Sequence, residues 1–526
     1  MFSNDRQRRT YETIAAAVPF GIDATKVRVE PGLSYTRSPI KAHDFATGVM
    51  AGLGSVIEHL GVMRGLPSQS MTLNRRRCGL LLNSGQLQFL NGYGCLMDTW
   101  PIGPDNGTYR TKDNRHITII GLHPHLRDAL LEYFQCPNST RGFQASVEKK
   151  PAQQIEDELA ALRLPAGVVR SAEEWARHPQ GEATAKLLPF GIEQRTKAGS
   201  RRLGKASHRP LEGVRVVEMA HLVAGPTVGR LLAEQGADVI KVQPPVGDWV
   251  LPLWLDVNWG KKCILLDIKS RIGKARLADL IAGADVLVNS NSPGALGRIG
   301  LDDAALDALN PNLVSVDISY CPPGTPWANR KGFEQIGQAV TGLMHANSEG
   351  MRDPTVISVL INDYMTGYIG AIGAVAALAA REESGGAWKV FASLAQSAMF
   401  ATRFVEPRDA EPYAPVTVQD MIDHGIDQQT PMGVMTRLKS GIEFSATPSY
   451  LTLPTGLPGI NPDTTTWSDF APPQPIAIPH SPSRVACEGG IRNLVAGYGI
   501  EDRGDGGGEF SLASRSLFEY VMESRR

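Results

Sequence analysis

Short apolar runs alternate with amphipathic stretches between residues 211 and 320, and this alternation predicts an α/β sheet. The expected strands are runs rich in β-branched residues, at 214–219, 237–242, 262–267, 284–289 and 313–318. The expected helices lie between them, at 227–235, 274–282 and 302–309. Strands that alternate with helices at this spacing indicate a parallel, doubly wound sheet with right-handed crossovers.

The turn after the first expected strand reads HLVAGP, residues 221–226. A dinucleotide site would need three glycines at GxGxxG spacing here and an acid about 20 residues further on. The turn has one glycine, Gly225, followed by Pro226, and the second strand ends in Lys241 and Gln243 instead of an acid. Dinucleotide binding is therefore disfavoured, and the ligand of this unit stays open at this point.

An internal repeat organises the rest of the chain. HDFATGVMAGLGSVIEHLGVMRG (43–65) resembles NDYMTGYIGAIGAVAALAAREESGG (362–386), so that Asp44 aligns with Asp363 and Gly48 with Gly367. A second pair of similar segments, 165–180 and 414–429, follows in the same order. Two such pairs indicate a duplication with unequal copies, because residues 1–209 show no counterpart of the parallel sheet.

The repeat predicts three parts. Residues 1–209 are expected to be a partial copy that includes a small domain, 210–400 the Rossmann-like half, and 401–526 a return segment and tail.

Composition narrows the class of protein. The 526 residues are too many for one ordinary core, and 42% hydrophobic with 20% charged residues is typical of a soluble globular chain. A net charge of −1 gives no sign of nucleic-acid or membrane partners. Six cysteines without CxxC spacing disfavour a zinc site or redox pair, and no metal site is expected. Without a signal peptide or a long apolar span, a reduced, cytoplasmic location is expected.

Six segments follow one another over about 180 residues: PLEGVRVVEMAHLVAGPTVGRLLAEQGADVIKVQPPVGD (210–248), NWGKKCILLDIKS (258–270), ADVLVNSNSPGALGRIGL (284–301), LNPNLVSVDIS (309–319), GFEQIGQAVTGLM (332–344) and INDYMTGYIGAIGAVAALAAREESGG (361–386). In this order they resemble family III coenzyme A transferases, the group of formyl-CoA transferase, carnitine CoA-transferase and the α-methylacyl-CoA racemases. Residues 1–209 resemble the family's later half, as in YRTKDNRHITIIGL (109–122).

The resemblance implies a fold and an activity. The fold would be a Rossmann-like large domain with a smaller α+β domain. The reaction would move coenzyme A from an acyl-CoA donor to a carboxylic acid acceptor, with coenzyme A as substrate and no separate cofactor. Because the family's subunits interlock in pairs, a homodimer or a fused pseudo-dimer is implied.

Asp363 is the catalytic residue that the resemblance implies. The residues alone predict a helix N-cap here, since aspartate is favoured before an apolar helix such as 364–380. In the family, the aspartate at this position is the nucleophile that forms a mixed anhydride and then an aspartyl-CoA thioester.

Glu334, in GFEQIGQAVTG, matches the glutamate that lies near the nucleophile in the transferase branch. The residues alone would make it a solvated or helix-starting acid. In the racemases a histidine base precedes this acid, whereas this chain has Phe333, which favours transfer over racemisation. An acyl-CoA racemase or isomerase and a non-catalytic acyl-CoA-binding protein remain as alternatives.

Five further residues are expected to bind coenzyme A: His221, Val223, Lys241, Arg298 and Lys331. Arg298 and Lys331 match positions that contact the phosphates or the adenine, although either residue could equally be a surface charge. Val223 replaces a glutamine of formyl-CoA transferase, which favours a more apolar substrate than formate or oxalate. Among the residues outside this set, Asp44 is expected to be a vestigial helix cap. The remaining histidines considered, His116, His123, His125 and His178, are expected to be ordinary polar residues.

Overall fold

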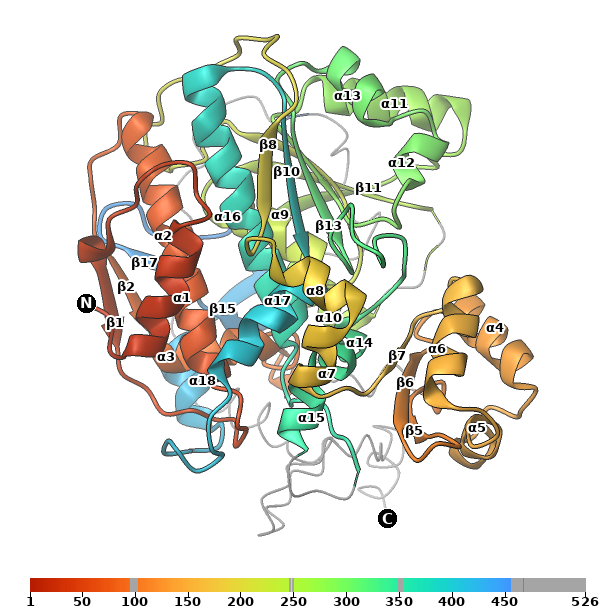
Figure 1. Ribbon diagram of the computed structural model, residues 1–526. Coiled ribbons are helices and arrows are strands. Elements are labelled where there is room, and N and C mark those ends of the chain that lie inside the picture. Colours follow the sequence, from red (N-terminus) through yellow and green to blue (C-terminus); the bar gives the residue numbers. More distant parts are fainter. Residues whose placement is uncertain (95–102, 246, 248–249, 349–352, 456–466, 468–526) are drawn as a thin grey trace.

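The computed structural model describes residues 1–94, 103–245, 247, 250–348, 353–455 and 467. Its centre is a seven-stranded sheet in the order β11-β10-β9-β12-β13-β14-β8, with the element labels of Figure 1. The strands are β8 (Gly191–Gln194), β9 (Arg215–Met219), β10 (Asp238–Gln243), β11 (Lys261–Leu265), β12 (Val286–Asn289), β13 (Val314–Ser319) and β14 (Trp388–Ser393).

The sheet confirms the predicted fold class. All pairs from β11 to β14 are parallel, and only β8 joins antiparallel, at the edge beside β14. Numbered from β9, the parallel strands have the order 3-2-1-4-5-6 that doubly wound nucleotide-binding sheets share. All five predicted strands are present, with ends shifted by at most two residues. The edge strand β8 comes from the N-terminal 209 residues, so both parts of the chain build this sheet.

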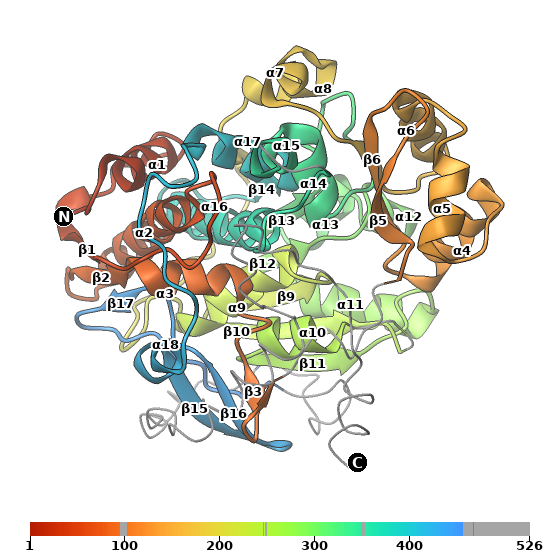
Figure 2. The same ribbon diagram turned by 90° about the horizontal axis from the view of Figure 1, so that it is seen from below.

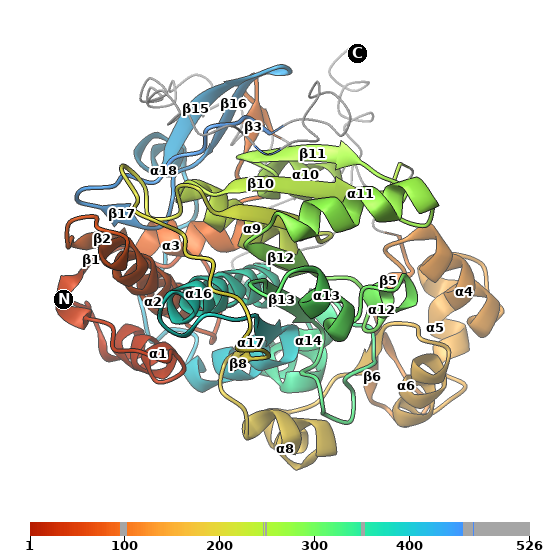
Figure 3. The same cartoon turned by 90° about the horizontal axis from the view of Figure 1, so that it is seen from above.

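Helices cover both faces of the sheet (Figure 3), and the three predicted ones are present. The helices between β9 and β13 are α9 (Ala224–Glu234), α10 (Leu251–Val257), α11 (Arg271–Ala282), α12 (Ala295–Arg298) and α13 (Asp303–Leu309). Helix α9 begins three residues earlier than predicted, because Gly225 and Pro226 lie within its first turn. A proline is tolerated there because its missing N–H would have no partner within the helix.

Two long helices form the middle of the molecule. Helix α16 (Ile361–Ser384) connects the parallel strands β13 and β14, and α2 (Ala42–Met63) connects the parallel strands β1 (Val27–Glu30) and β2 (Met71–Asn74). Helix α16 packs against α2 and against α9, while α1 (Asp5–Ala15) packs against α2 (Figures 1 and 2). Both long helices are apolar and long enough to cross a membrane by composition, yet most of their surface is buried in this core.

The repeat is visible in how these helices touch. A Cβ atom on Gly48 would lie 2.7 Å from the Gln7 carbonyl oxygen and 2.4 Å from the Thr10 Cβ of α1. A Cβ atom on Gly367 would lie 2.7 Å from the Ala224 carbonyl oxygen and 2.5 Å from the Thr227 Cβ of α9. The α1–α2 pair therefore repeats the α9–α16 pair. Residues 1–209 thus keep a counterpart of α9 and a two-stranded remnant of the parallel sheet, which the sequence did not reveal.

A small lobe stands beside the sheet (Figure 1). Its antiparallel strands are β5 (Asn106–Arg110), β6 (His116–Ile120) and β7 (Ala166–Val168), and its helices are α4 (Pro124–Phe134), α5 (Thr140–Val147) and α6 (Ala152–Ala161). These elements have their own apolar core. The lobe touches the large domain through α14 (Glu334–Thr341), and α7 (Ala172–Arg177) and α8 (Pro179–Ala185) lead on to β8.

The segment after β14 returns to the N-terminal part of the chain. It contains α17 (Leu394–Ala401), α18 (Val418–His424), β15 (Gly425–Thr430), β16 (Gly433–Leu438) and β17 (Glu443–Phe444). Strand β16 pairs with β3 (Phe89–Leu90), next to β4 (Tyr93–Gly94), and β17 pairs with β2. Helices α3 (Arg75–Leu80) and α15 (Leu343–Asn347) complete the α-helices of the described residues. The division of the chain at residues 209 and 400 stays a prediction.

We expect Gly48→Ala to destabilise the protein by about 1–3 kcal/mol, because the added methyl group would force α1 away from α2. Gly61→Ala, in the same helix, is the matched control. Its Cβ atom would meet only ordinary contacts at 3.5 Å or more, and alanine favours the helix by about 1 kcal/mol. Chemical denaturation measures both free energies of unfolding. Equal stability of the two variants would contradict the close packing of α1 on α2.

Candidate active site

The carboxyl ends of the parallel strands meet at one edge of the sheet, where the site residues gather. The strand order reverses between β9 and β12, and the crevice at such a point is where open α/β sheets bind ligands. Helix α9 follows β9 and therefore starts at this edge. Helix α16 precedes β14, which is parallel to the others, so its N-terminus lies at the same edge. The first turns of both helices thus face one region.

Asp363 and Glu334, the two predicted catalytic residues, are brought together at this edge. Asp363 lies in the first turn of α16 and Glu334 is the first residue of α14. The backbone N–H of Asp363 donates to Glu334 Oε2 at 2.6 Å, and the Gln338 amide donates to Glu334 Oε1 at 2.7 Å. Glu334 is buried, whereas Asp363 keeps part of its surface exposed.

Asp363 is not the N-cap that the residues alone predicted. The N-cap is Leu360, which makes no side-chain capping bond, and Asp363 is the third helical residue. Its neighbours fix the turn instead: the Asn362 amide donates to the Glu334 carbonyl oxygen at 3.1 Å, and the Tyr364 hydroxyl donates to Asp256 at 2.8 Å. The backbone around the carboxylate is therefore held from both sides, and Asp363 keeps part of its surface exposed.

The two carboxyl groups share an environment that disfavours charge. Burial raises the pKa of Asp363, and burial together with the nearby Asp363 carboxylate raises the pKa of Glu334. Within the described part of the chain, no hydrogen bond or ion pair reaches the Asp363 carboxylate to offset this. Two carboxyl groups this close resist ionising together, so one negative charge shared between them is favoured near neutral pH.

A small pocket of about 50 Å³ opens at the same edge, beside β9 and β10. Phe333, which precedes Glu334, lies with its ring centroid 6.3 Å from that of His123, a residue of the pocket wall. We call it the His123–His221 pocket; it is lined by His123, His221, Leu222, Lys241, Gln243, Val250, Leu253, Trp254 and Asn258.

Two of the five residues expected to bind coenzyme A line this pocket. His221 is exposed at its rim, directly after β9. Lys241 is buried, and its Nζ donates to Glu218 Oε1 at 2.6 Å and to the Ala220 carbonyl oxygen at 2.7 Å. Lys261 donates to the other oxygen of Glu218 at 2.6 Å. Lys241 therefore belongs to a buried ion-pair cluster, and its contact with coenzyme A stays a prediction.

The other three lie outside the pocket just described. Val223 is the N-cap residue of α9 and is fully buried in the core, so only its backbone is near the edge. Arg298 is exposed at the end of α12. Lys331 is half-buried in the loop before α14, where burial and the nearby Arg163 lower its pKa. Their roles toward coenzyme A stay predictions.

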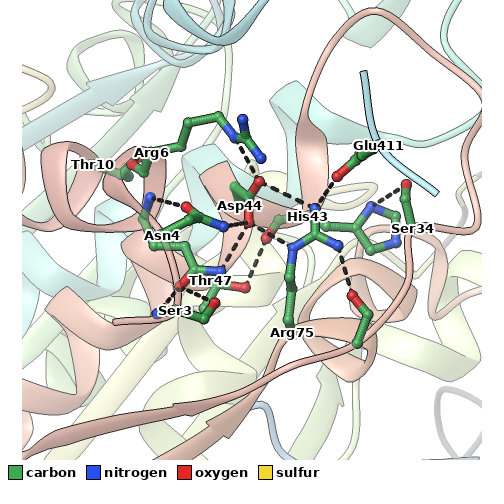
Figure 4. A network of polar contacts seen from close by, with 12 residues as sticks. Ser3, Asn4, Arg6, Thr10, Ser34, His43, Asp44, Thr47, Arg75 and Glu411 are labelled. Carbon is green, nitrogen blue, oxygen red and sulfur yellow. Dashed lines mark hydrogen bonds and ion pairs between the residues drawn. The ribbon is translucent and has the colours of Figure 1, made fainter. Parts of the chain in front are cut away.

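Asp44, the counterpart of Asp363 in the repeat, has the opposite environment (Figure 4). Its buried carboxylate accepts two hydrogen bonds from Arg75, at 2.6 and 3.1 Å, and one from Arg6 at 2.7 Å. The side-chain amides of Asn4 and Gln7 each donate at 2.8 Å. Burial alone would raise the pKa of Asp44, but these donors, Arg75 foremost, hold it far below its ordinary value.

This network corrects the expectation that Asp44 is a vestigial cap. Asp44 is the third residue of α2, and Lys41, the N-cap, makes no side-chain capping bond. Arg75 continues from Asp44 to Glu411 at 2.5 Å, and Arg6 continues to Glu406 at 2.9 Å. Asp44 therefore ties α1, α2, α3 and the segment after α17 together, and its charge is satisfied by the protein itself.

The sequence missed most of the pocket wall. His123 was expected to be an ordinary polar residue, yet it lines the pocket together with Trp254 and Asn258. His123 and Trp254 belong to no local motif, and they meet Asn258 because α4, α10 and β9 converge. Among the described residues, no group of three or more His, Cys, Asp and Glu side chains could hold a metal ion.

Comparison with known proteins finds a family model that matches part of the chain. Residues 211–415 match the model of CoA-transferase family III. The acetyl-coenzyme A transferase nodX of Hypoxylon pulicicidum is 34% identical over 316 residues, which cover 54% of this chain and 52% of that protein. The succinyl-CoA–D-citramalate CoA-transferase of Chloroflexus aurantiacus is 35% identical over 189 residues, which cover 34% of this chain and 47% of that protein.

A solved structure of a CAIB/BAIF family protein from Brucella suis aligns at 29% identity with a TM-score of 0.36. The alignment covers 43% of this chain and 65% of that one. The chain spans about half the length of the curated relatives that it matches.

We expect Asp44→Asn to destabilise the protein by about 3–5 kcal/mol, because Arg75 would lose the charge that compensates it in a buried position. Asp363→Asn is the matched control at the equivalent helical position. It should leave stability unchanged or raise it, since it removes a charge that burial disfavours. Urea denaturation of both variants measures the difference. A smaller loss for Asp44→Asn than for Asp363→Asn would contradict the structural role of Asp44.

Proposed function

We propose that this chain moves coenzyme A from an acyl-CoA donor to a carboxylic acid, and the match of residues 211–415 to the model of CoA-transferase family III supports this proposal. The observation that carries the proposal is the Asp363–Glu334 pair. Asp363 of this pair is partly exposed, and its carboxylate has no hydrogen bond or ion pair with any described residue at the carboxyl edge of the doubly wound sheet. A carboxylate of this kind suits covalent catalysis, because its oxygen is not occupied by a cation.

In the proposed first half-reaction, an Asp363 carboxylate oxygen attacks the thioester carbon of the donor. The C–S bond breaks, and coenzyme A leaves as a thiolate that carries the electron pair. The thiolate then attacks the Asp363 carbonyl carbon of the mixed anhydride. The C–O bond breaks, the donor acid leaves as a carboxylate, and an aspartyl-CoA thioester remains.

In the second half-reaction, the acceptor carboxylate attacks this thioester and expels the thiolate. The thiolate attacks the acceptor carbonyl carbon, which releases the new acyl-CoA and restores the Asp363 carboxylate. No proton is gained or lost overall, and the exchange is divided into steps with lower barriers.

The environment of the pair favours the covalent intermediate. Burial and the neighbouring Glu334 make an ionised Asp363 costly. Conversion of Asp363 into an anhydride or a thioester removes its charge, so both penalties disappear in the intermediate. Glu334 also holds Asp363 in place, because its carboxylate accepts a hydrogen bond from the backbone N–H of Asp363.

In this scheme the N-terminal copy has a structural role and not a catalytic one. Its equivalent aspartate is Asp44. Both carboxylate oxygens of Asp44 accept hydrogen bonds from the side chains of Arg6, Arg75, Asn4 and Gln7, so neither is free to attack a thioester. We therefore propose one reactive aspartate in each chain, with the N-terminal copy standing where a second subunit would pack against α16.

We expect a covalent adduct of the mass of coenzyme A when the protein is incubated with a suitable acyl-CoA. Acetyl-CoA, succinyl-CoA and butyryl-CoA form the test panel, and the adduct should map to the peptide that contains Asp363. Intact-protein and peptide mass spectrometry measure it, at one adduct for each chain. Borohydride reduction of the thioester would confirm the attachment to a carboxyl group.

Asp363→Asn should form no adduct and should lose at least a thousandfold in exchange rate, since an amide cannot act as this nucleophile. Asp44→Gln, to be compared only after its folding has been verified, should still carry the adduct on Asp363. Full transferase activity in Asp363→Asn would overturn the mechanism. An adduct on Asp44 would overturn the assignment of a single reactive aspartate.

The rate of adduct formation should rise as the pH is raised through the elevated pKa of Asp363, because only the ionised carboxylate attacks. The midpoint should lie well above pH ~4, the range of an ordinary aspartate. Glu334→Gln removes a neighbouring like charge and should move the midpoint to lower pH. Single-turnover rates between pH 4 and 9 measure both. A wild-type midpoint near pH 4 would contradict the burial of the pair.

A further inference from the structure

The N-terminal copy contacts the first turn of α16 at two points. The backbone N–H of Leu360, the N-cap residue of α16, donates to the Leu82 carbonyl oxygen at 3.1 Å. The backbone N–H of Gly85 donates to the Tyr364 hydroxyl oxygen, also at 3.1 Å. Leu82 and Gly85 belong to one short segment that follows α3. A single segment of the N-terminal copy therefore holds α16 both before and after Asp363.

A buried aspartate of α10 lies at the centre of this contact. Asp256 is 4% exposed, and its Oδ2 accepts hydrogen bonds from the hydroxyls of Tyr364 and Ser84, both at 2.8 Å. Its Oδ1 accepts from the Arg230 guanidinium of α9 at 2.9 Å, which supplies the opposite charge that a buried carboxylate needs. We call Asp256, Tyr364, Ser84 and Arg230 the Asp256 cluster. It joins α9, α10, α16 and the N-terminal copy.

The Tyr364 hydroxyl is held in one orientation within this cluster. It donates to Asp256 and accepts from Gly85, and a Cβ atom on Gly85 would lie only 3.3 Å from it. Burial and the nearby Asp256 raise the pKa of Tyr364 well above its ordinary value, so the hydroxyl remains a donor. The Gln88 amide donates to the carbonyl oxygens of Gly85, at 3.0 Å, and Pro252, at 2.5 Å, and so fixes the segment on α10.

The direction of the Asp363 side chain depends on this turn. Its carboxylate has no hydrogen bond or ion pair with any described residue, and its backbone N–H is bound by Glu334. The carboxylate therefore points where the backbone of the first turn directs it. Glu334 holds that turn from α14, and Tyr364 holds it from the opposite side. A displacement of about 1 Å in a reacting group can cost on the order of a hundredfold in rate.

We propose that Tyr364 is a positioning residue for Asp363, and that the N-terminal copy acts on the reaction through it, by way of Ser84 and Gly85. The inference rests on the transferase function proposed above. Tyr364 acts through the backbone, because its hydroxyl anchors the residue directly after the nucleophile. The N-terminal copy is then not catalytic itself, but the rate of the chemical step depends on it.

Tyr364→Phe tests the proposal, because it removes only the hydroxyl group. The donor is whichever of acetyl-CoA, succinyl-CoA and butyryl-CoA gives the highest yield of adduct with the wild type. Rapid-quench mass spectrometry follows the adduct at Asp363 over a range of donor concentrations. The rate at saturating donor should fall about ten- to a hundredfold, while the half-saturating donor concentration should stay within about twofold of the wild type.

Tyr368→Phe is the matched control. Tyr368 lies one turn further along α16 and is 2% exposed, but its hydroxyl makes no hydrogen bond with any described residue. This variant should form the adduct at the rate of the wild type. An unchanged rate in Tyr364→Phe, or an equal loss in Tyr368→Phe, would overturn the proposal. So would a change confined to the half-saturating concentration, which would make Tyr364 a binding residue instead.

Ser84→Ala tests the part of the N-terminal copy. It should slow adduct formation by about three- to tenfold, the size expected for one hydrogen bond. The loss in the double variant with Tyr364→Phe should be smaller than the product of the two single losses, because both hydroxyls act on Asp256. A rate unchanged by Ser84→Ala, or losses that multiply, would overturn the link between the N-terminal copy and Tyr364.

The variants need to be folded for this comparison, which circular dichroism and urea denaturation verify. If Tyr364→Phe does not fold, Ser84→Ala decides alone. A slower adduct at an unchanged half-saturating concentration supports the proposal, and the rate of the wild type overturns it. Failure of the wild type to form any adduct at Asp363 would instead remove the transferase function itself, and this inference with it.

Discussion

The close packing of α16 between α2 and α9 is the constraint on which the rest of the structure depends. At Gly367 the backbone of α9 comes so near that no Cβ atom fits, and Gly48 plays the same part between α2 and α1. Helices that touch through glycine cannot slide or rotate without a clash. The first turn of α16 is therefore fixed against the edge of the sheet, and with it the position of Asp363 beside Glu334.

The two copies of the repeat show how surroundings alone can separate two chemically identical groups. Asp44 and Asp363 are both the third residue of a long apolar helix. Five donated hydrogen bonds hold the pKa of Asp44 down, while burial beside another carboxyl group raises that of Asp363. The helix N-terminus, common to both, therefore does not decide their charge. The decisive groups are Arg75 and Arg6, which come from other elements.

The sequence predicted the strands and helices that a local pattern of residues encodes. The β-branched runs marked the five central strands, and the repeated small-residue helices marked α2 and α16. The predictions failed where residues far apart in the chain meet. Asp44 was expected to be a cap but anchors a network of hydrogen bonds, and the ion pair between Lys241 and Glu218 had no signal in the sequence. His123 had no local signal at all, since its place in the pocket depends on how the small lobe rests against the sheet.

The pairing of distant strands has a consequence for how the chain is made. Strand β3, near residue 90, finds its partner β16 only after some 340 further residues have left the ribosome, as the pairing of Phe89 with Thr436 shows. Strand β8 likewise waits for β14, and α2 for α16. Contacts of such high sequence separation form late and slowly. During synthesis the surface that α2 buries against α16 stays uncovered until α16 emerges, and exposed apolar surface of this kind favours aggregation.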